Sequence, residues 1–124
     1  MNPVLCRVLA ADDDPTVALL LRATLKAPAF ALTVFDNGLA AVDACRRQIF
    51  DIVLLDVEMP GLDGLAAAAE IRAMRGAGLP LVLVSGREDA PFIAECERLA
   101  ARRLAKPVDW RTLAERLRAW SGQG

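Results

Sequence analysis

The stretch that most constrains the fold is a short apolar run that stops at a carboxylate. Residues 52–55 (Ile-Val-Leu-Leu) lead directly into Asp56, and a Pro-Gly pair and an Asp-Gly pair follow within residues 60–64. Four consecutive apolar residues predict a strand buried on both faces, as in a parallel sheet covered by helices. The prolines and glycines predict a loop immediately after it. Asp56 is therefore expected at the carboxyl end of a parallel strand, where open α/β folds place their chemistry.

Similar apolar runs recur along the chain and alternate with helical patterns. The predicted strands are 4–11, 31–35, 52–55, 79–84 and 103–105, and the predicted helices are 15–26, 39–48, 64–75 and two that begin at Asp89 and Asp109. Strands that alternate with helices favour an α/β domain with helices on both faces of the sheet. A chain of 124 residues, of which 55% are hydrophobic, suffices for one domain with a substantial core.

Three consecutive carboxylates follow the first predicted strand. Asp14 precedes Pro15, an order typical of the N-cap and the first position of a helix. Asp12 and Asp13 are not needed for that cap. If their strand lies beside that of Asp56, three carboxylates meet, and such like charges raise one another's pKa unless a cation relieves them. Oxygen ligands in a partly open cluster suit Mg²⁺, and a solvated acidic turn is the alternative.

Two further strand ends carry complementary polar groups. Ser85 follows the fourth apolar run, and Lys106 follows the fifth. A hydroxyl, an ammonium and Mg²⁺ beside a carboxylate are the groups that stabilise a phosphoryl group during its transfer. Asp56 would then be the nucleophile that forms an acyl phosphate. Taken singly, Ser85 and Lys106 are better explained as polar residues at strand ends than as ligands, so the prediction depends on the joint occurrence of all these groups at successive strand ends.

With these motifs the chain resembles the receiver domain of two-component response regulators, the module typified by the chemotaxis response regulator. The resemblance covers about residues 4–121 and rests on Asp12-Asp13, Asp56, residues 59–61 (Met-Pro-Gly), residues 63–64 (Asp-Gly), Ser85 and residues 106–107 (Lys-Pro). It implies a single doubly wound (βα)5 flavodoxin-like domain over residues 1–124, with a five-stranded parallel sheet in the order 2-1-3-4-5. Residues 121–124 are expected to form a frayed end.

The resemblance also implies Mg²⁺ as the cofactor and assigns its ligands. The carboxylates of Asp13 and Asp56 and the backbone carbonyl of Glu58 would bind the ion directly, and Asp12 would act through a water molecule. The chain would then be a signalling module and not an enzyme. Its only chemistry would be Mg-dependent self-phosphorylation from a donor and slow autodephosphorylation.

A third implication concerns the partners. Asp56 would accept a phosphoryl group from the phosphohistidine of a histidine kinase or a histidine phosphotransfer protein, and Ser85 and Lys106 would hold it. A downstream protein target or a fused output domain would read the modified state. The chain contains no histidine, which excludes Ser-His-Asp chemistry, histidine-based zinc sites and a phosphohistidine relay on this chain.

Two positions depart from the family pattern. Receivers usually have a tyrosine or phenylalanine three residues before the lysine, and this chain has Arg103 there. Leu99 stands where a glycine is common, and the chain contains no tyrosine. A guanidinium cannot occupy an apolar slot without a partner. We therefore expect the usual aromatic switch to be absent or replaced.

Charged residues beside the predicted site suggest two further hypotheses. Glu58 and Arg87, each two residues after a site residue, would form an ion pair over the phosphoryl group and slow its hydrolysis; alternatively they are two solvated charges. Arg98, Arg102 and Arg103 would form a basic face for an acidic partner, or a solvated face. The same region, formed by the helix that begins at Asp89, the strand 103–105 and the helix that begins at Asp109, is where a homodimer would form.

Composition excludes several other classes. A net charge of −1 argues against a nucleic-acid binder. No apolar run approaches the ~20 residues of a membrane span, and the first residues lack the charged region of a signal peptide. Three widely spaced cysteines are expected as buried thiols in a reducing cytoplasm. Two alternative functions remain: a haloacid-dehalogenase-like phosphatase, which needs a second aspartate where Glu58 stands, and a pseudo-receiver that only scaffolds contacts.

Overall fold

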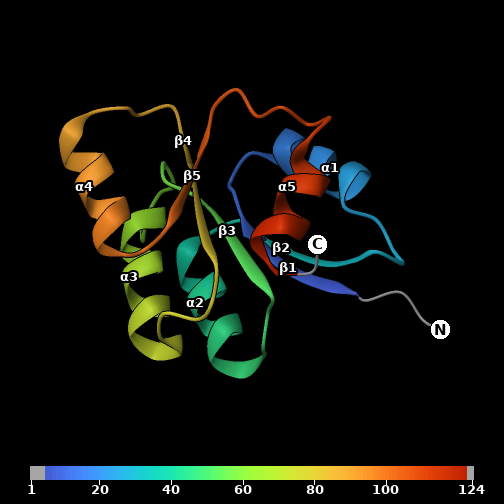
Figure 1. The fold of residues 1–124 in the computed structure, drawn as a ribbon, viewed down its shortest axis with the longest axis horizontal. Helices are drawn as coiled ribbons and strands as arrows, with labels where there is room; N and C mark the ends of the chain where they lie inside the picture. The colour runs from blue at the N-terminus through green and yellow to red at the C-terminus, as the bar shows by residue number, and fades with distance from the viewer. Residues whose placement is uncertain (1–4, 123–124) are drawn as a thin grey trace.

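The computed structural model describes residues 5–122 and contains a central sheet between two layers of helices (Figure 1). Strands and helices alternate throughout. The strands are β1 (Cys6–Ala11), β2 (Phe30–Phe35), β3 (Ile52–Asp56), β4 (Leu81–Ser85) and β5 (Arg102–Ala105). The helices are α1 (Pro15–Thr24), α2 (Gly38–Arg47), α3 (Gly64–Arg75), α4 (Ala90–Arg98) and α5 (Leu113–Trp120).

All strand pairs are parallel, and the sheet order is β2-β1-β3-β4-β5. The predicted α/β class and the order 2-1-3-4-5 are therefore confirmed. The register pairs Ala11 with Leu55, Asp56 with Val84 and Ser85 with Ala105. Because the strands run in the same direction, β1, β3, β4 and β5 end at one edge of the sheet.

Side chains alternate along each strand between two separate cores. Leu9 and Ala11 of β1 pack with residues of α2, α3 and α4, whereas Val8 and Ala10 pack with residues of α1 and α5. Figure 1 shows these two groups of helices on opposite sides of the sheet. Every residue of β3 and β4 is buried. Burial on both faces explains why these strands appear in the sequence as continuous apolar runs.

Short polar side chains start four of the five helices. The carboxylate or amide oxygens of Asp14, Asn37, Asp63 and Asp89 each accept a hydrogen bond from a backbone N–H in the first turn of the helix that follows. Such caps satisfy donors that have no partner within the helix. The N-cap predicted at Asp14 is confirmed, with Pro15 at the first helical position.

The start predicted for the last helix is wrong. Residues 110–112 form a turn, and α5 begins only at Leu113. The carboxylate of Asp109 accepts from the N–H of Arg111 at 3.1 Å, so it stabilises this turn and does not cap the helix. Trp110 consequently lies before the helix and not within it.

The predicted frayed end falls partly outside the described residues, which exclude 1–4 and 123–124. The hydroxyl of Ser121 donates to the carbonyl of Arg118 at 2.9 Å and accepts a weak hydrogen bond from the Cys6 thiol at 3.5 Å. Residue 121 thus connects the end of α5 to the start of β1.

The end of α4 contains an alanine with a positive φ. Ala100 has φ 53°, in the left-handed region. Its N–H donates to the carbonyl of Glu97, and the N–H of Ala101 donates to the carbonyl of Cys96. These are the two bonds of a Schellman motif, in which glycine is preferred at the position that Ala100 occupies. The alanine side chain therefore destabilises this turn.

Replacing Ala100 by glycine is expected to raise the free energy of unfolding by about 0.5–1 kcal/mol, because removal of Cβ relieves the left-handed conformation by more than the added flexibility of the unfolded chain costs. Denaturant unfolding followed by circular dichroism measures the change. Ala101→Gly is the matched control. Ala101 itself does not adopt the left-handed conformation, so this substitution should destabilise the domain. Equal effects of the two substitutions would contradict the explanation.

Candidate functional site

The polar groups singled out in the sequence lie together at the carboxyl edge of the sheet. Asp12 and Asp13 follow β1, Asp56 ends β3, and Ser85 ends β4. Lys106 follows β5, and its N–H donates to the carbonyl of Ser85 at 3.2 Å. Backbone pairing therefore places five side chains from four strands around one region, as the sequence predicted from the strand ends.

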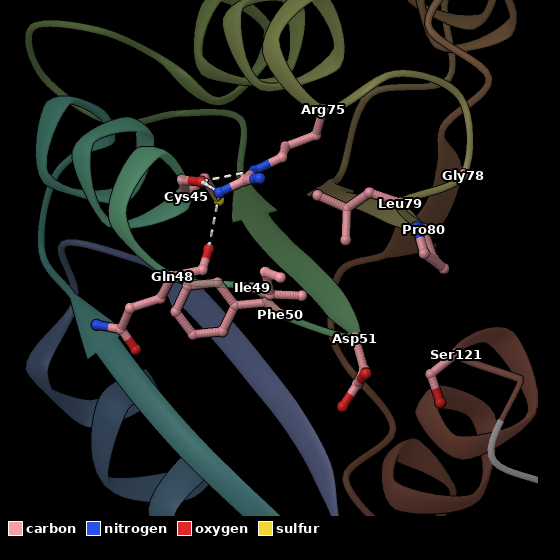
Figure 2. Close-up of a pocket in the computed structure, with 10 residues that line it drawn as sticks. All are labelled: Cys45, Gln48, Ile49, Phe50, Asp51, Arg75, Gly78, Leu79, Pro80 and Ser121. Atoms are coloured by element: carbon pink, nitrogen blue, oxygen red, sulfur yellow. Dashed lines mark hydrogen bonds between the residues drawn. The ribbon is translucent and has the colours of Figure 1, made fainter.

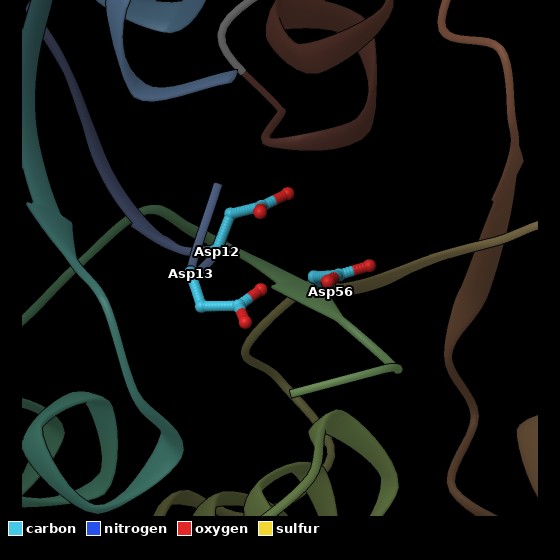
Figure 3. A group of neighbouring side chains, drawn as sticks. All are labelled: Asp12, Asp13 and Asp56. Carbon is cyan, nitrogen blue, oxygen red and sulfur yellow. The ribbon is translucent and has the colours of Figure 1, made fainter. Parts of the chain in front are cut away.

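Three carboxylates form the centre of this region. Figure 3 shows the side chains of Asp12, Asp13 and Asp56 extending from the ends of β1 and β3 into a shared space. One oxygen of each lies within 4.8 Å of the others. Asp56 is 3% exposed and Asp12 8%, whereas Asp13 is exposed. The cluster is thus open on one side, at Asp13.

Lys106 is the cation closest to the buried carboxylate. Its Nζ lies 2.6 Å from Oδ1 of Asp56 and 3.6 Å from Oε2 of Glu58. Burial raises the pKa of Asp56 above its usual value, although Lys106 opposes this shift. Burial alone would lower the pKa of Lys106, but Asp56, Glu58 and Asp12 together raise it. The two groups therefore stabilise each other as an ion pair.

The cluster fits a divalent cation. Oδ1 of Asp56 is buried, and its one close polar neighbour among residues 5–122 is the ammonium of Lys106, 2.6 Å away. Burial also raises the pKa of Asp12, an effect that its neighbouring carboxylates increase. Three carboxylates beside one ammonium leave an excess of negative charge. Hard oxygen ligands with an open side are the donor set that Mg²⁺ prefers.

Ser85 is buried and makes two hydrogen bonds at the site. Its hydroxyl donates to Oε1 of Glu58 at 2.8 Å, and its Oγ accepts from the backbone N–H of Arg87 at 3.0 Å. Glu58 therefore contacts both the hydroxyl and the ammonium of the site. This contact between residues 27 positions apart has no signal in the sequence.

The ion pair predicted between Glu58 and Arg87 is not formed, and that hypothesis is corrected. Arg87 instead donates from Nε and Nη2 to the two carboxylate oxygens of Asp89, each at 2.9 Å. Its guanidinium also lies over the ring of Phe92, 4.9 Å from the centroid. Arg87 lowers the pKa of Asp89 to about 2. A partner two residues away requires less ordering of the chain than one across the sheet.

The arginines of the predicted basic face are engaged differently from one another. Arg98 pairs with Glu95 at 2.7 Å. Arg102 and Arg116 lie over the ring of Trp120, 5.3 and 4.9 Å from its centroid. The exposed Arg103 lines a cavity of about 320 Å³, next to Ser85. The position of the usual aromatic residue is thus occupied by a solvated guanidinium.

Two features of the site escaped the sequence analysis. An apolar cavity of about 270 Å³ lies between α1 and α5, and Asp56, Lys106 and Trp110 are among the residues that line it. Gly64 packs so closely on β3 that a Cβ there would lie 2.3 Å from the carbonyl oxygen of Asp56. The Asp-Gly pair signalled a loop, but only the packing of α3 shows that the glycine is required.

A third cavity, of about 360 Å³, lies at the opposite edge of the sheet, near the starts of β3 and β4 (Figure 2). Arg75 donates there to the carbonyls of Cys45 and Gln48 and so satisfies the end of α2. Burial raises the pKa of the Cys45 thiol to about 11, which makes it a poor nucleophile. These contacts are structural, and the chemistry-bearing residues lie at the other edge.

Within the described part of the chain, every helix is too short or too polar to cross a membrane.

Comparison with known proteins agrees with the fold. The family model of the response regulator receiver domain matches residues 8–118. The sensor protein GacS of Pseudomonas syringae pv. syringae is 34% identical over 125 residues, which cover 94% of this chain and 13% of GacS. The DNA-binding response regulator MtrA of Mycolicibacterium smegmatis is 32% identical over 120 residues, which cover 96% of this chain and 52% of MtrA.

A solved structure adds a metal ion to the comparison. The receiver domain of the sensor histidine kinase PA1611 from Pseudomonas aeruginosa PAO1 holds a magnesium ion in its active-site cleft. It is 27% identical with a TM-score of 0.78, and the match covers 96% of this chain and 99% of that domain. The chain spans about half the length of MtrA and a small part of GacS. From its sheet order and the family match over most of its length, the chain belongs to the response regulator receiver domains of two-component systems.

Proposed function

We propose that residues 1–124 form a single receiver domain that accepts a phosphoryl group on Asp56 from the phosphohistidine of a histidine kinase or a histidine phosphotransfer protein. The observation that carries this proposal is the buried carboxylate of Asp56 with an ammonium 2.6 Å away and two further carboxylates beside it. The 124-residue sequence contains no histidine, so the phosphohistidine belongs to a partner or to another domain.

The transfer is a displacement at phosphorus. A carboxylate oxygen of Asp56 forms the new P–O bond while the P–N bond of phosphohistidine breaks, and the imidazole nitrogen keeps the electron pair. Lys106 exchanges its contact with Asp56 for one with a phosphoryl oxygen, and the hydroxyl of Ser85 donates to another. Both groups stabilise negative charge that concentrates on the phosphoryl oxygens.

Mg²⁺ is the cofactor we propose. The carboxylates of Asp13 and Asp56 and the backbone carbonyl of Glu58 would hold it, and Asp12 would act through water. When bound, the ion neutralises charge on the cluster and on the phosphoryl oxygens. The convergence of three carboxylates beside a single ammonium supports this assignment.

The modified domain signals by contact, and its own chemistry is limited to self-phosphorylation and slow autodephosphorylation. We propose a downstream protein or a fused output domain as the reader, with the α4, β5 and α5 face as the docking or homodimer surface. Because Arg103 is exposed and charged, the response would move a guanidinium and not bury an aromatic ring. The free, buried thiols of Cys6, Cys45 and Cys96 fit a reducing cytoplasm.

The central test replaces Asp56 by asparagine. Wild-type protein incubated with phosphoramidate and Mg²⁺ is expected to gain the mass of one phosphoryl group, and Asp56→Asn should gain none, because an amide lacks the nucleophilic oxygen. Intact-protein mass spectrometry gives the readout. Asp43→Asn, the same change at a partly exposed position on α2, is the control and should label normally.

Two other results would contradict the proposal. Continuous release of phosphate without a stable label would indicate a phosphatase of the haloacid-dehalogenase type. An absence of any label on the wild-type protein would indicate a pseudo-receiver.

Mg²⁺ binding provides a second test. Asp13→Asn should weaken Mg²⁺ binding by about tenfold or more, because it removes one of the few charged ligands. Fluorescence of Trp110, which lines the cavity shared with Asp56, reports binding in a Trp120→Phe background. Asp14→Asn is the matched control, since asparagine caps a helix as well as aspartate does. If both substitutions weakened Mg²⁺ binding equally, Asp13 would act through the net negative charge of the region and not as a ligand of the ion.

A further inference from the structure

Glu58 contacts both groups that are poised to receive a phosphoryl oxygen. Its Oε1 accepts from the hydroxyl of Ser85 at 2.8 Å, and its Oε2 lies 3.6 Å from Nζ of Lys106. The two oxygens of one carboxylate thus interact with a hydroxyl on β4 and an ammonium after β5. Within the described residues, the Ser85 hydroxyl donates to Glu58 alone.

The backbone around Glu58 is held in place, but its side chain can leave the contact with Ser85 and Lys106. The backbone around it is held by the N–H groups of Met59 and Gly64, which both donate to the carbonyl of Val57. The side chain of Glu58, however, is 51% exposed. Its carboxylate can return to water with little loss of folding free energy, since partly exposed ion pairs contribute only modestly to stability.

Arg87 does not draw Glu58 away from the site. Its guanidinium is held by both oxygens of Asp89 and lies over Phe92. The charge nearest to Glu58 is therefore Lys106, which it shares with Asp56.

We propose that Glu58 is an internal competitor of the phosphoryl group. Its carboxylate holds Ser85 and Lys106 in the unmodified domain and must release both when Asp56 is phosphorylated. A carboxylate and a phosphoryl group both present anionic oxygens to a hydroxyl and an ammonium, so the two cannot occupy the same donors. This inference rests on the function proposed above and adds that Glu58 slows phosphorylation.

The test measures initial phosphorylation rates with phosphoramidate at saturating Mg²⁺. Glu58→Ala is expected to react about threefold to tenfold faster than wild type, as judged from the strength of a partly exposed, charge-assisted hydrogen bond. Glu58→Asp keeps the charge but is one methylene shorter, and it should also react faster. If Glu58 acted only by repelling the anionic donor, Glu58→Asp would retain the wild-type rate and the inference would be overturned.

A matched control excludes a general effect of charge. Glu88→Gln removes one negative charge from an exposed position in the loop after β4, and its rate should equal that of wild type. Acceleration equal to that of Glu58→Ala would overturn the inference. Thermal unfolding of each variant should match wild type, because Glu58 is half-exposed.

A readout without a phosphodonor examines the contact itself. The N–H of Arg87 donates to Oγ of Ser85, so release of the hydroxyl from Glu58 should shift the amide signal of Arg87 in an NMR spectrum. Glu58→Ala and Glu58→Asp should both shift it, and an unchanged signal in both would overturn the inference.

The outcomes separate this inference from the proposed function. If wild type is labelled on Asp56 and the Glu58 variants react at the wild-type rate, only the competitor role fails. If wild type takes no label at all, both proposals fail together.

Discussion

Parallel pairing of the strands is the constraint on which the site depends. Since every strand runs in the same direction, the carboxyl ends of β1, β3, β4 and β5 share one edge of the sheet. The interiors of β3 and β4 are buried on both faces and admit no uncompensated polar group. Polar side chains are tolerated where these strands end. The residues that carry chemistry are therefore gathered at the edge by the same packing that builds the two cores.

The electrostatics of the site follow from this burial. A carboxylate at the end of a central strand loses much of its hydration, which raises the pKa of Asp56, and Lys106 only partly offsets the loss. Asp12 and Asp13 add negative charge within reach of the same point. The cluster thus carries an excess of negative charge, which a bound divalent cation would offset.

The residues around the site divide into those with local partners and those with distant ones. Arg87 pairs with Asp89 two residues away, and this choice leaves Glu58 to interact with Ser85 and Lys106. Arg103, at the solvent-facing edge of the sheet, is exposed instead of buried. The charged residues around the carboxylate cluster therefore contact Ser85 and Lys106 without changing the three carboxylates themselves.

Local patterns in the sequence determined the strands, the Asp14 cap and the polar residues at the strand ends, because apolar continuity and capping depend on neighbours in the chain. The start of α5 escaped prediction, since Asp109 suits a helix cap and a turn equally well, and its carboxylate accepts from Arg111 within a turn that precedes the helix. Close contact between α3 and β3 requires Gly64, and the partner of Glu58 lies on another strand. Such contacts depend on distances between segments far apart in sequence, and these exist only once the sheet has formed.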